Sequence, residues 1–149
     1  VSVLVSQATH IDGLLEEHGR ELDLLAERAP HEIDTTLLIH PTLFADFLEF
    51  NDLTVIAEQA IVEHGLEGIL QIASFHPRFQ FAGTESEDIG NYTNRAPYPT
   101  LHLLREASIA RAVDAVPEPE TIYQRNIETL RELGLAGWMA LGLRDIERS

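Results

Sequence analysis

Apolar and polar positions along the first quarter of the chain follow two different periods. Residues 1–6 (VSVLVS) are rich in β-branched side chains and partly alternate, which predicts a strand. Residues 11–28 place isoleucine and leucine at helical spacing with glutamates between them, which predicts an amphipathic helix. Residues 33–39 (IDTTLLI) return to an apolar, β-branched run and predict a second strand, which stops at His40-Pro41.

The pattern repeats once more before the period is lost. Residues 42–64 predict two helical segments, the second capped by Asp52. Residues 69–75 predict a third strand, which stops at His76-Pro77 in the same way as the second strand stops. This matched ending suggests that the two strands finish in similar surroundings.

A long segment without helical or strand period follows, over residues 77–99. Its aromatic side chains argue for an ordered loop, and loops of this length in a compact domain are often functional. Helices are predicted after it, over residues 101–113 and from residue 117 to Gly134. The remaining residues 135–149 show no firm period.

The predicted order of elements is β-α-β-αα-β-loop-α-α. Strands separated by helices favour parallel pairing, so we expect an α/β fold with a small, three-stranded, mostly parallel sheet flanked by helices. A chain of 149 residues suits one domain, which we place at residues 1–134. Residues 135–149 are expected to form a weakly structured C-terminal extension.

Composition narrows the partners and the chemistry. The formal net charge is −15, and no basic stripe offsets it, so we expect no binding to nucleic acid or to an anionic membrane surface. The sequence contains no cysteine and no lysine, which excludes thiolate and Schiff-base chemistry in this chain. No secretory signal pattern opens the chain, and we expect a cytoplasmic protein.

A candidate site follows from the two His-Pro pairs. The carboxyl ends of parallel strands meet at one edge of a sheet, which is where open α/β sheets bind ligands. His40 and His76 would therefore stand at the same edge, about one or two strand spacings (about 5–10 Å) apart. The loop over residues 77–99 leaves from that edge and would form a wall or lid.

Three kinds of chemistry suit such a cluster, and the residues alone leave all three open. His40, His76 and His102 could ligate a divalent metal ion with water in an open position. His40 or His76 could act as an acid–base catalyst oriented by a carboxylate. Arginines could hold the carboxylate or phosphate of a small anionic molecule. The anion-binding residues would be Arg78, Arg95 and Arg105, with Asn91, Asn94 and Tyr98 as further substrate contacts.

Each of these residues also has a purely structural interpretation. A histidine at a strand end can bond a loop carbonyl, and Asn91 and Asn94 are typical turn residues. Arg95 and Arg105 can hold the loop in place through pairs that contribute little stability each.

Long, ordered motifs carry a resemblance to a known family. The segments TTLLIHP, QIASFHP, FQFAGT, NYTNRAPYP and LHLLRE, all between Thr35 and Glu106, resemble an uncharacterised bacterial family, domain of unknown function 1415. The resemblance covers roughly residues 1–134 and implies no established activity. Members usually carry a further N-terminal segment with a Leu-Cys-Pro-Phe stretch, so the resemblance implies that this chain is an N-terminally truncated member.

Two hypotheses on function result. The first is a cytoplasmic enzyme that acts on a small anionic substrate at a pocket lined by histidine and arginine, with a metal ion as an optional cofactor. The second is a non-catalytic binding or interaction domain that uses the loop over residues 77–99. The oligomeric state is left open by the sequence.

Overall fold

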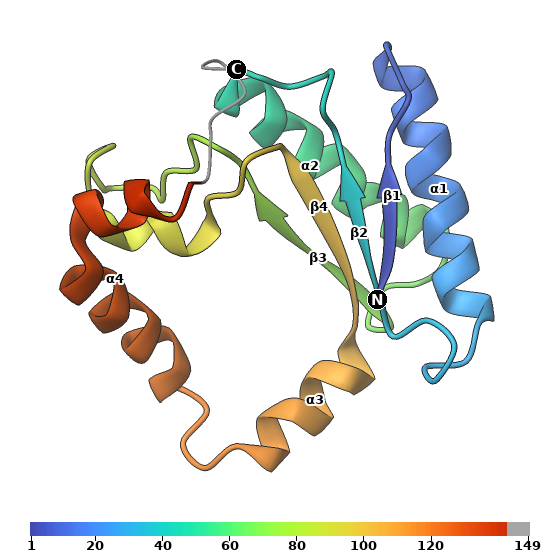
Figure 1. Cartoon of the computed structure of the whole chain (residues 1–149). Coiled ribbons are helices and arrows are strands. Elements are labelled where there is room, and N and C mark those ends of the chain that lie inside the picture. The colour runs from blue at the N-terminus through green and yellow to red at the C-terminus, as the bar shows by residue number, and fades with distance from the viewer. Residues whose placement is uncertain (143–149) are drawn as a thin grey trace.

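One mixed sheet of four strands organises the structure. The computed structural model describes residues 1–142 of the 149 (Figure 1). The strands lie in the order β1-β2-β4-β3, with β1 parallel to β2 and β4 antiparallel to both β2 and β3. Their bounds are β1 Ser2–Val5, β2 Thr35–Ile39, β3 Leu70–Phe75 and β4 Thr100–Arg105. The α/β class and the three predicted strands are confirmed, and β1 lies at one edge of the sheet.

The fourth strand is the main departure from the sequence-based prediction. Residues 101–105 were predicted to begin a helix, but they form β4, which inserts between β2 and β3. Leu101, Leu103 and Arg105 are buried on one side, and His102 and Leu104 alternate with them. That period of two is a strand period, and pairing on both sides supplies every ladder bond that a central strand needs. The sheet therefore has four strands and is not mostly parallel.

Two helices cover one face of the sheet. They are α1 (Ile11–Glu27), which lies beside β1 in Figure 1, and α2 (Phe47–Glu63), which passes behind the strands. Their leucines pack against alternate residues of the strands and form two adjoining clusters. The fully or almost fully buried members are Leu14, Leu38, Phe50, Leu53, Ala57 and Leu101 in one cluster, and Leu22, Leu25, Ile61, Leu70 and Leu103 in the other.

Helix α2 is a single helix, where the sequence predicted two segments. It begins after Asp46, whose carboxylate accepts a hydrogen bond from the Glu49 N–H at 3.1 Å, and it continues through Asp52 without a break. Asp46 and Glu49 have the three-residue spacing of a helix-start signal, which explains why the helix begins there.

The C-terminal third forms an arm that extends from the sheet. Helices α3 (Glu106–Ala115) and α4 (Thr121–Ala140) make up this arm, and α4 returns to contact η1 (Ile89–Asn94), a 3₁₀ helix in the loop (Figure 1). Gly134 has a φ of 67°, so helical geometry breaks at the predicted end, but helical turns resume as far as Ala140. The rest of the predicted extension, residues 143–149, lies outside the described residues.

No helix in the described range is both long and apolar enough to span a membrane.

Replacing Leu101 by alanine tests the assignment of β4 as a strand. Leu101 is fully buried in the core, so we expect Leu101→Ala to lower the free energy of unfolding by about 2–5 kcal/mol in chemical denaturation. Leu104→Ala is the matched control, because Leu104 lies on the other face and is half-buried. Its loss should be clearly smaller. A helix would place both leucines on one face, so equal losses would contradict the strand.

Candidate functional site

His40 and His76 lie at the same edge of the sheet, as the two His-Pro pairs predict. Ile39 and Phe75 both pair with Thr100 of β4, so the two histidines that follow them stand at the same level. Strand β4 separates them, which puts β2 and β3 about 10 Å apart. Their backbones are held by the chain that enters β4: the His40 N–H donates to the Pro99 carbonyl, and the His76 N–H donates to the Asn94 carbonyl.

The His76 ring is fixed by bonds at both nitrogens. Its Nδ1 accepts from the Arg78 backbone N–H at 2.9 Å, so the proton is on Nε2, which donates to the Phe44 carbonyl at 2.8 Å. The ring is fully buried and packs on Phe47 and Phe50. Both lone pair and proton are already used, so His76 has the structural role of bonding a loop carbonyl, and it is not placed to ligate a metal or exchange a proton with a ligand.

His40 is also buried, but within residues 1–142 its ring is not held by hydrogen bonds as the His76 ring is. It is 1% exposed, and among the described residues neither ring nitrogen has a hydrogen-bond partner. Burial lowers the pKa of His40 to about 4, and the neighbouring His18 ring acts in the same direction. His18 is also fully buried, with Nε2 donating to the Ala57 carbonyl and Nδ1 unpartnered. The two neutral imidazoles form a buried polar pair inside the α1–sheet layer, which the sequence did not indicate.

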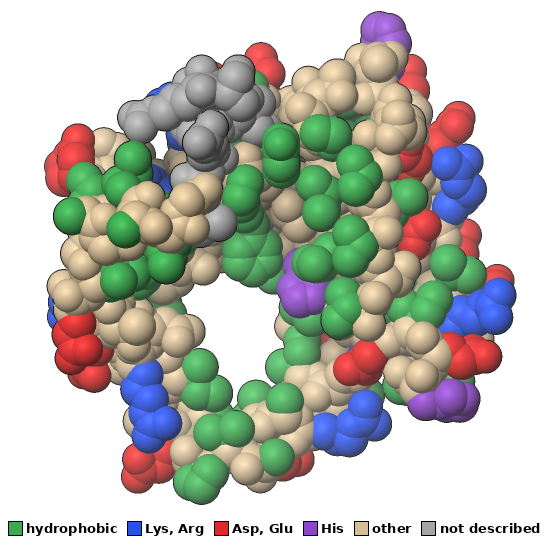
Figure 2. Space-filling model, in the orientation of Figure 1, with side chains coloured by type: hydrophobic (Ala, Val, Ile, Leu, Met, Phe, Trp, Pro, Cys, Tyr) green, Lys and Arg blue, Asp and Glu red, His purple; other side chains and the backbone are tan. Residues whose placement is uncertain are grey.

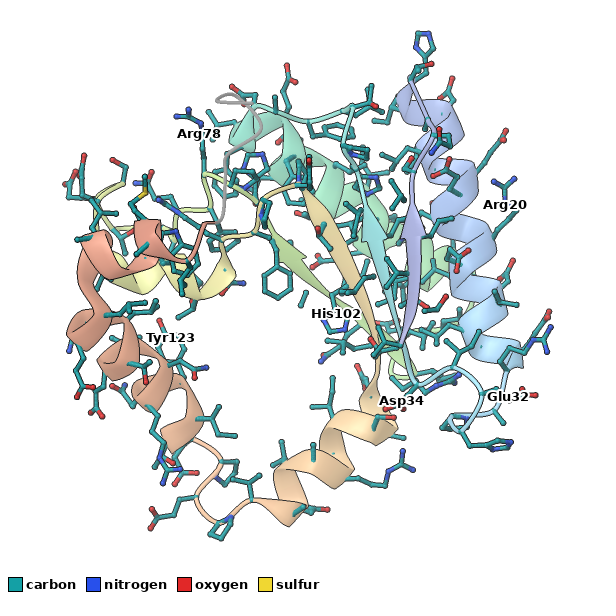
Figure 3. All side chains as sticks on the ribbon, viewed as in Figure 1. Arg20, Glu32, Asp34, Arg78, His102 and Tyr123 are labelled. Carbon is teal, nitrogen blue, oxygen red and sulfur yellow. The ribbon has the colours of Figure 1, made fainter. Side chains whose placement is uncertain are left out.

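His102 does not join the other two predicted ligands. It was predicted on a helix beside Arg105 and Glu106, but it lies in the middle of β4 on the sheet face opposite α1 and α2, where it bonds the Thr35 hydroxyl (Figure 3). Burial lowers its pKa. Between residues 1 and 142, no three histidine, aspartate or glutamate side chains come together in a way that could hold a metal ion. The predicted three-histidine metal site is therefore not formed.

Arg105 lies at the opposite end of the sheet from the two histidines. Because β4 runs antiparallel to β2 and β3, its last residue pairs with Leu70, the first residue of β3. Arg105 is 8% exposed, and its guanidinium donates to the Ile33 carbonyl at 2.7 Å and the Arg28 carbonyl at 2.8 Å. The prediction that Arg105 helps hold a ligand beside the histidines is wrong, because the strand direction sends it away.

The two predicted asparagines hold the loop together. Asn91 is fully buried; its Oδ1 accepts from the Phe81 N–H and the Thr84 hydroxyl, and its Nδ2 donates to the Glu85 carbonyl. Asn94 donates to the Ser74 carbonyl and so ties the loop to β3. These contacts favour the structural interpretation of both residues.

Tyr98 is 43% exposed at the entry to β4, and its backbone carbonyl accepts from Thr100.

Arg95 is the predicted ligand-binding residue that does line a pocket. Its Nε donates to the Phe79 carbonyl at 3.1 Å and its Nη2 donates to the Ser86 carbonyl at 2.8 Å. The guanidinium lies 4.1 Å from the centre of the Tyr92 ring, a cation–π contact. These contacts hold the guanidinium in one place before any ligand arrives.

The pocket lies between the loop and the start of α2, and its volume is about 690 Å³. The loop contributes Arg78, which is labelled in Figure 3, and Arg95. The other lining residues are Ala45, Asp46, Phe47 and Leu48 around the first turn of α2, Pro77, Gln80, Ser86, Glu87 and Tyr92 from the loop, and Leu135 from α4. A volume in this range suits a small organic molecule.

Sequence reasoning missed the parts of this pocket that come from the two helices. The spacing of Asp46 and Glu49 was an available signal for the start of α2. Nothing in the sequence indicated Leu135, because only the folding of the arm brings α4 to the loop.

These features define a two-layer α/β protein with a polar pocket formed by a long loop and a helix start. A family profile described as a protein of unknown function (DUF1415) matches residues 1–140. The chain belongs to this family, which confirms the resemblance. No curated protein and no solved structure matches the chain.

The buried His40 predicts a loss of stability in mild acid. The unfolded chain binds a proton at this residue with the ordinary pKa of about 6.5, whereas the folded chain resists it until about pH 4. The stability is therefore complete above about pH 6.5 and falls as the pH drops toward 4, by about 3 kcal/mol from His40 alone.

Urea denaturation of the parent and of His40→Leu at several pH values measures this effect. Leucine does not titrate and leaves no polar atom unpartnered, so the variant should be at least as stable at pH 7 and lose less stability toward pH 4. His31→Leu, at an exposed histidine, is the control and should follow the parent. Identical pH profiles for the parent and His40→Leu would refute the prediction.

Proposed function

We propose that the chain binds a small anionic molecule in the pocket between the loop and α2. The observation that carries the proposal is the presence of Arg78 and Arg95 in one pocket of suitable volume. Two arginines in one concave site are unusual in a chain with a net charge of −15, because most of such a surface repels anions.

The fixed position of Arg95 supports recognition of a planar anionic group. A guanidinium has five N–H groups, and the two backbone carbonyls and the Tyr92 ring fix its orientation. The remaining N–H groups can form parallel bonds to a carboxylate without further loss of side-chain entropy.

The acidic residues in the lining narrow the kind of anion. Asp46 caps α2, and Glu87 bonds the Ser86 hydroxyl, which together with a backbone bond and the charge of Arg95 lowers the pKa of Glu87. Two carboxylates in the lining repel a multiply charged ligand. We therefore propose a singly charged molecule, such as a small carboxylate, in preference to a polyphosphate.

Binding has more support than a reaction carried by the two histidines. Neither His40 nor His76 lines the pocket, and both rings are buried. In this proposal the two histidines stabilise the fold, and the two arginines bind the ligand. It places the protein in the cytoplasm, where small carboxylates are abundant.

Isothermal titration calorimetry with a panel of small carboxylates and inorganic phosphate tests the proposal. Arg95→Gln and Arg78→Gln should each weaken binding of the best carboxylate about tenfold or more, the effect of losing one charge-assisted hydrogen bond. Arg95→Lys keeps the charge without the planar fork and should recover only part of the affinity.

Arg20→Gln is the matched control, since Arg20 is exposed on α1, far from Arg78 (Figure 3). It should bind as the parent does. Circular dichroism should show that all four variants are folded. If no carboxylate binds the parent, or if the arginine variants and the control bind alike, the proposal is lost.

A further inference from the structure

The sheet face opposite α1 and α2 is largely apolar, and no helix or strand between residues 1 and 142 covers it. We call this the open sheet face, and its side chains alternate with those of the core along each strand. The apolar ones are Val3, Val5, Leu37, Ile39, Phe75 and Leu104, and the polar side chains of Thr35, Gln71 and His102 lie among them. Val3 and Val5 are 56% and 47% exposed. Figure 2 shows apolar side chains gathered on this face, with a histidine among them and the charged side chains toward the margin, an arrangement typical of an interface.

The arm formed by α3 and α4 also exposes apolar side chains, although α4 contacts η1. Helix α3 has no buried residue, and Leu130 is the one buried residue of α4. Short helices draw most of their stability from packing an apolar face, so the scarcity of buried side chains in α3 and in α4, outside the contact of α4 with η1, indicates a missing contact. The exposed apolar side chains of the arm are Val113, Ile122, Tyr123, Leu133, Leu135 and Met139.

An opening separates the arm from the sheet. In Figure 2 it passes through the molecule, and in Figure 3 His102 of β4 and Tyr123 of α4 lie on opposite sides of it. The arm therefore does not cover the open sheet face of its own chain.

The accessible area of the chain supports a missing interface. The chain exposes 9144 Å², whereas a compact monomer of 16.7 kDa exposes about 7600 Å². The excess of about 1500 Å² exceeds the roughly 800 Å² that each partner covers in a standard dimer.

We propose that two copies of the chain dimerise, with the arm of each copy lying against the open sheet face of the other. In a two-fold dimer, the contact between the open sheet face of one copy and the arm of the other occurs twice. A second copy therefore covers both unpartnered surfaces of each chain. A foreign segment on the sheet would leave the arm exposed. The dimer goes beyond ligand binding and does not depend on it.

Sedimentation velocity of residues 1–149 tests the dimer over a wide range of protein concentration. The mass should rise from one chain to two, and association should tighten with added salt, because each copy carries a net charge of −15 and salt screens the repulsion. Val3→Glu on the sheet and Tyr123→Glu on the arm should each raise the dissociation constant at least tenfold.

A mixture of these two variants provides a sharper test. Each variant alone places a charge in both of its sheet–arm contacts, whereas a mixed dimer gathers both charges in one contact and leaves the other as in the parent. The mixture should therefore associate more tightly than either variant alone. Val55→Glu, at a 63% exposed valine on α2, is the matched control and should dimerise as the parent does.

Two outcomes would overturn the proposal. One is a monomer at every concentration and salt level, which would mean that a second copy of the chain does not cover the open sheet face. The other is a dimer that Val55→Glu dissociates and that Val3→Glu and Tyr123→Glu leave intact. Circular dichroism of each variant separates loss of association from loss of folding.

Discussion

The antiparallel pairing of β4 between β2 and β3 is the constraint on which the rest of the structure depends. It joins the two halves of the chain and completes the apolar layer beneath α1 and α2 through Leu101 and Leu103. It also sets His40 and His76 one strand apart and carries Arg105 to the other end of the sheet. Four of the polar residues that the sequence singled out take their positions from this one strand: His40, His76, His102 and Arg105.

Buried polar groups in this protein are mostly satisfied by backbone atoms. His76 and Arg105 bond backbone groups of distant segments, and Asn91 bonds backbone groups within its own loop, so all three fix irregular segments in place. Among the described residues, His40 and His18 are two exceptions, since their unpartnered nitrogens remain buried and neutral at a cost in free energy. Histidine therefore has two different roles in this protein: His76 anchors a loop, whereas His18 and His40 make the core sensitive to acid.

The two proposals concern separate surfaces that share one element. The pocket is lined by Arg78, Arg95 and the start of α2, while the open sheet face lies on the far side of the strands from α2. Helix α4 belongs to both, because Leu135 lines the pocket and the rest of the arm is free to meet a second copy. Packing of the arm in a dimer would therefore also steady one wall of the pocket.

The sequence by itself determined the local elements and the family. The periods of apolar residues located three strands and the helices between them, and the paired His40-Pro41 and His76-Pro77 correctly placed both histidines at one edge. Local signals failed where long-range pairing decided: residues 100–105 suit a helix or a strand, and only the gap between β2 and β3 selects the strand. The direction of that strand removed Arg105 and His102 from the site, and the return of α4 added Leu135 to the pocket. Whether a polar side chain faces a ligand or a backbone carbonyl depends on segments far away in the chain, so the site was the part that only the tertiary structure could decide.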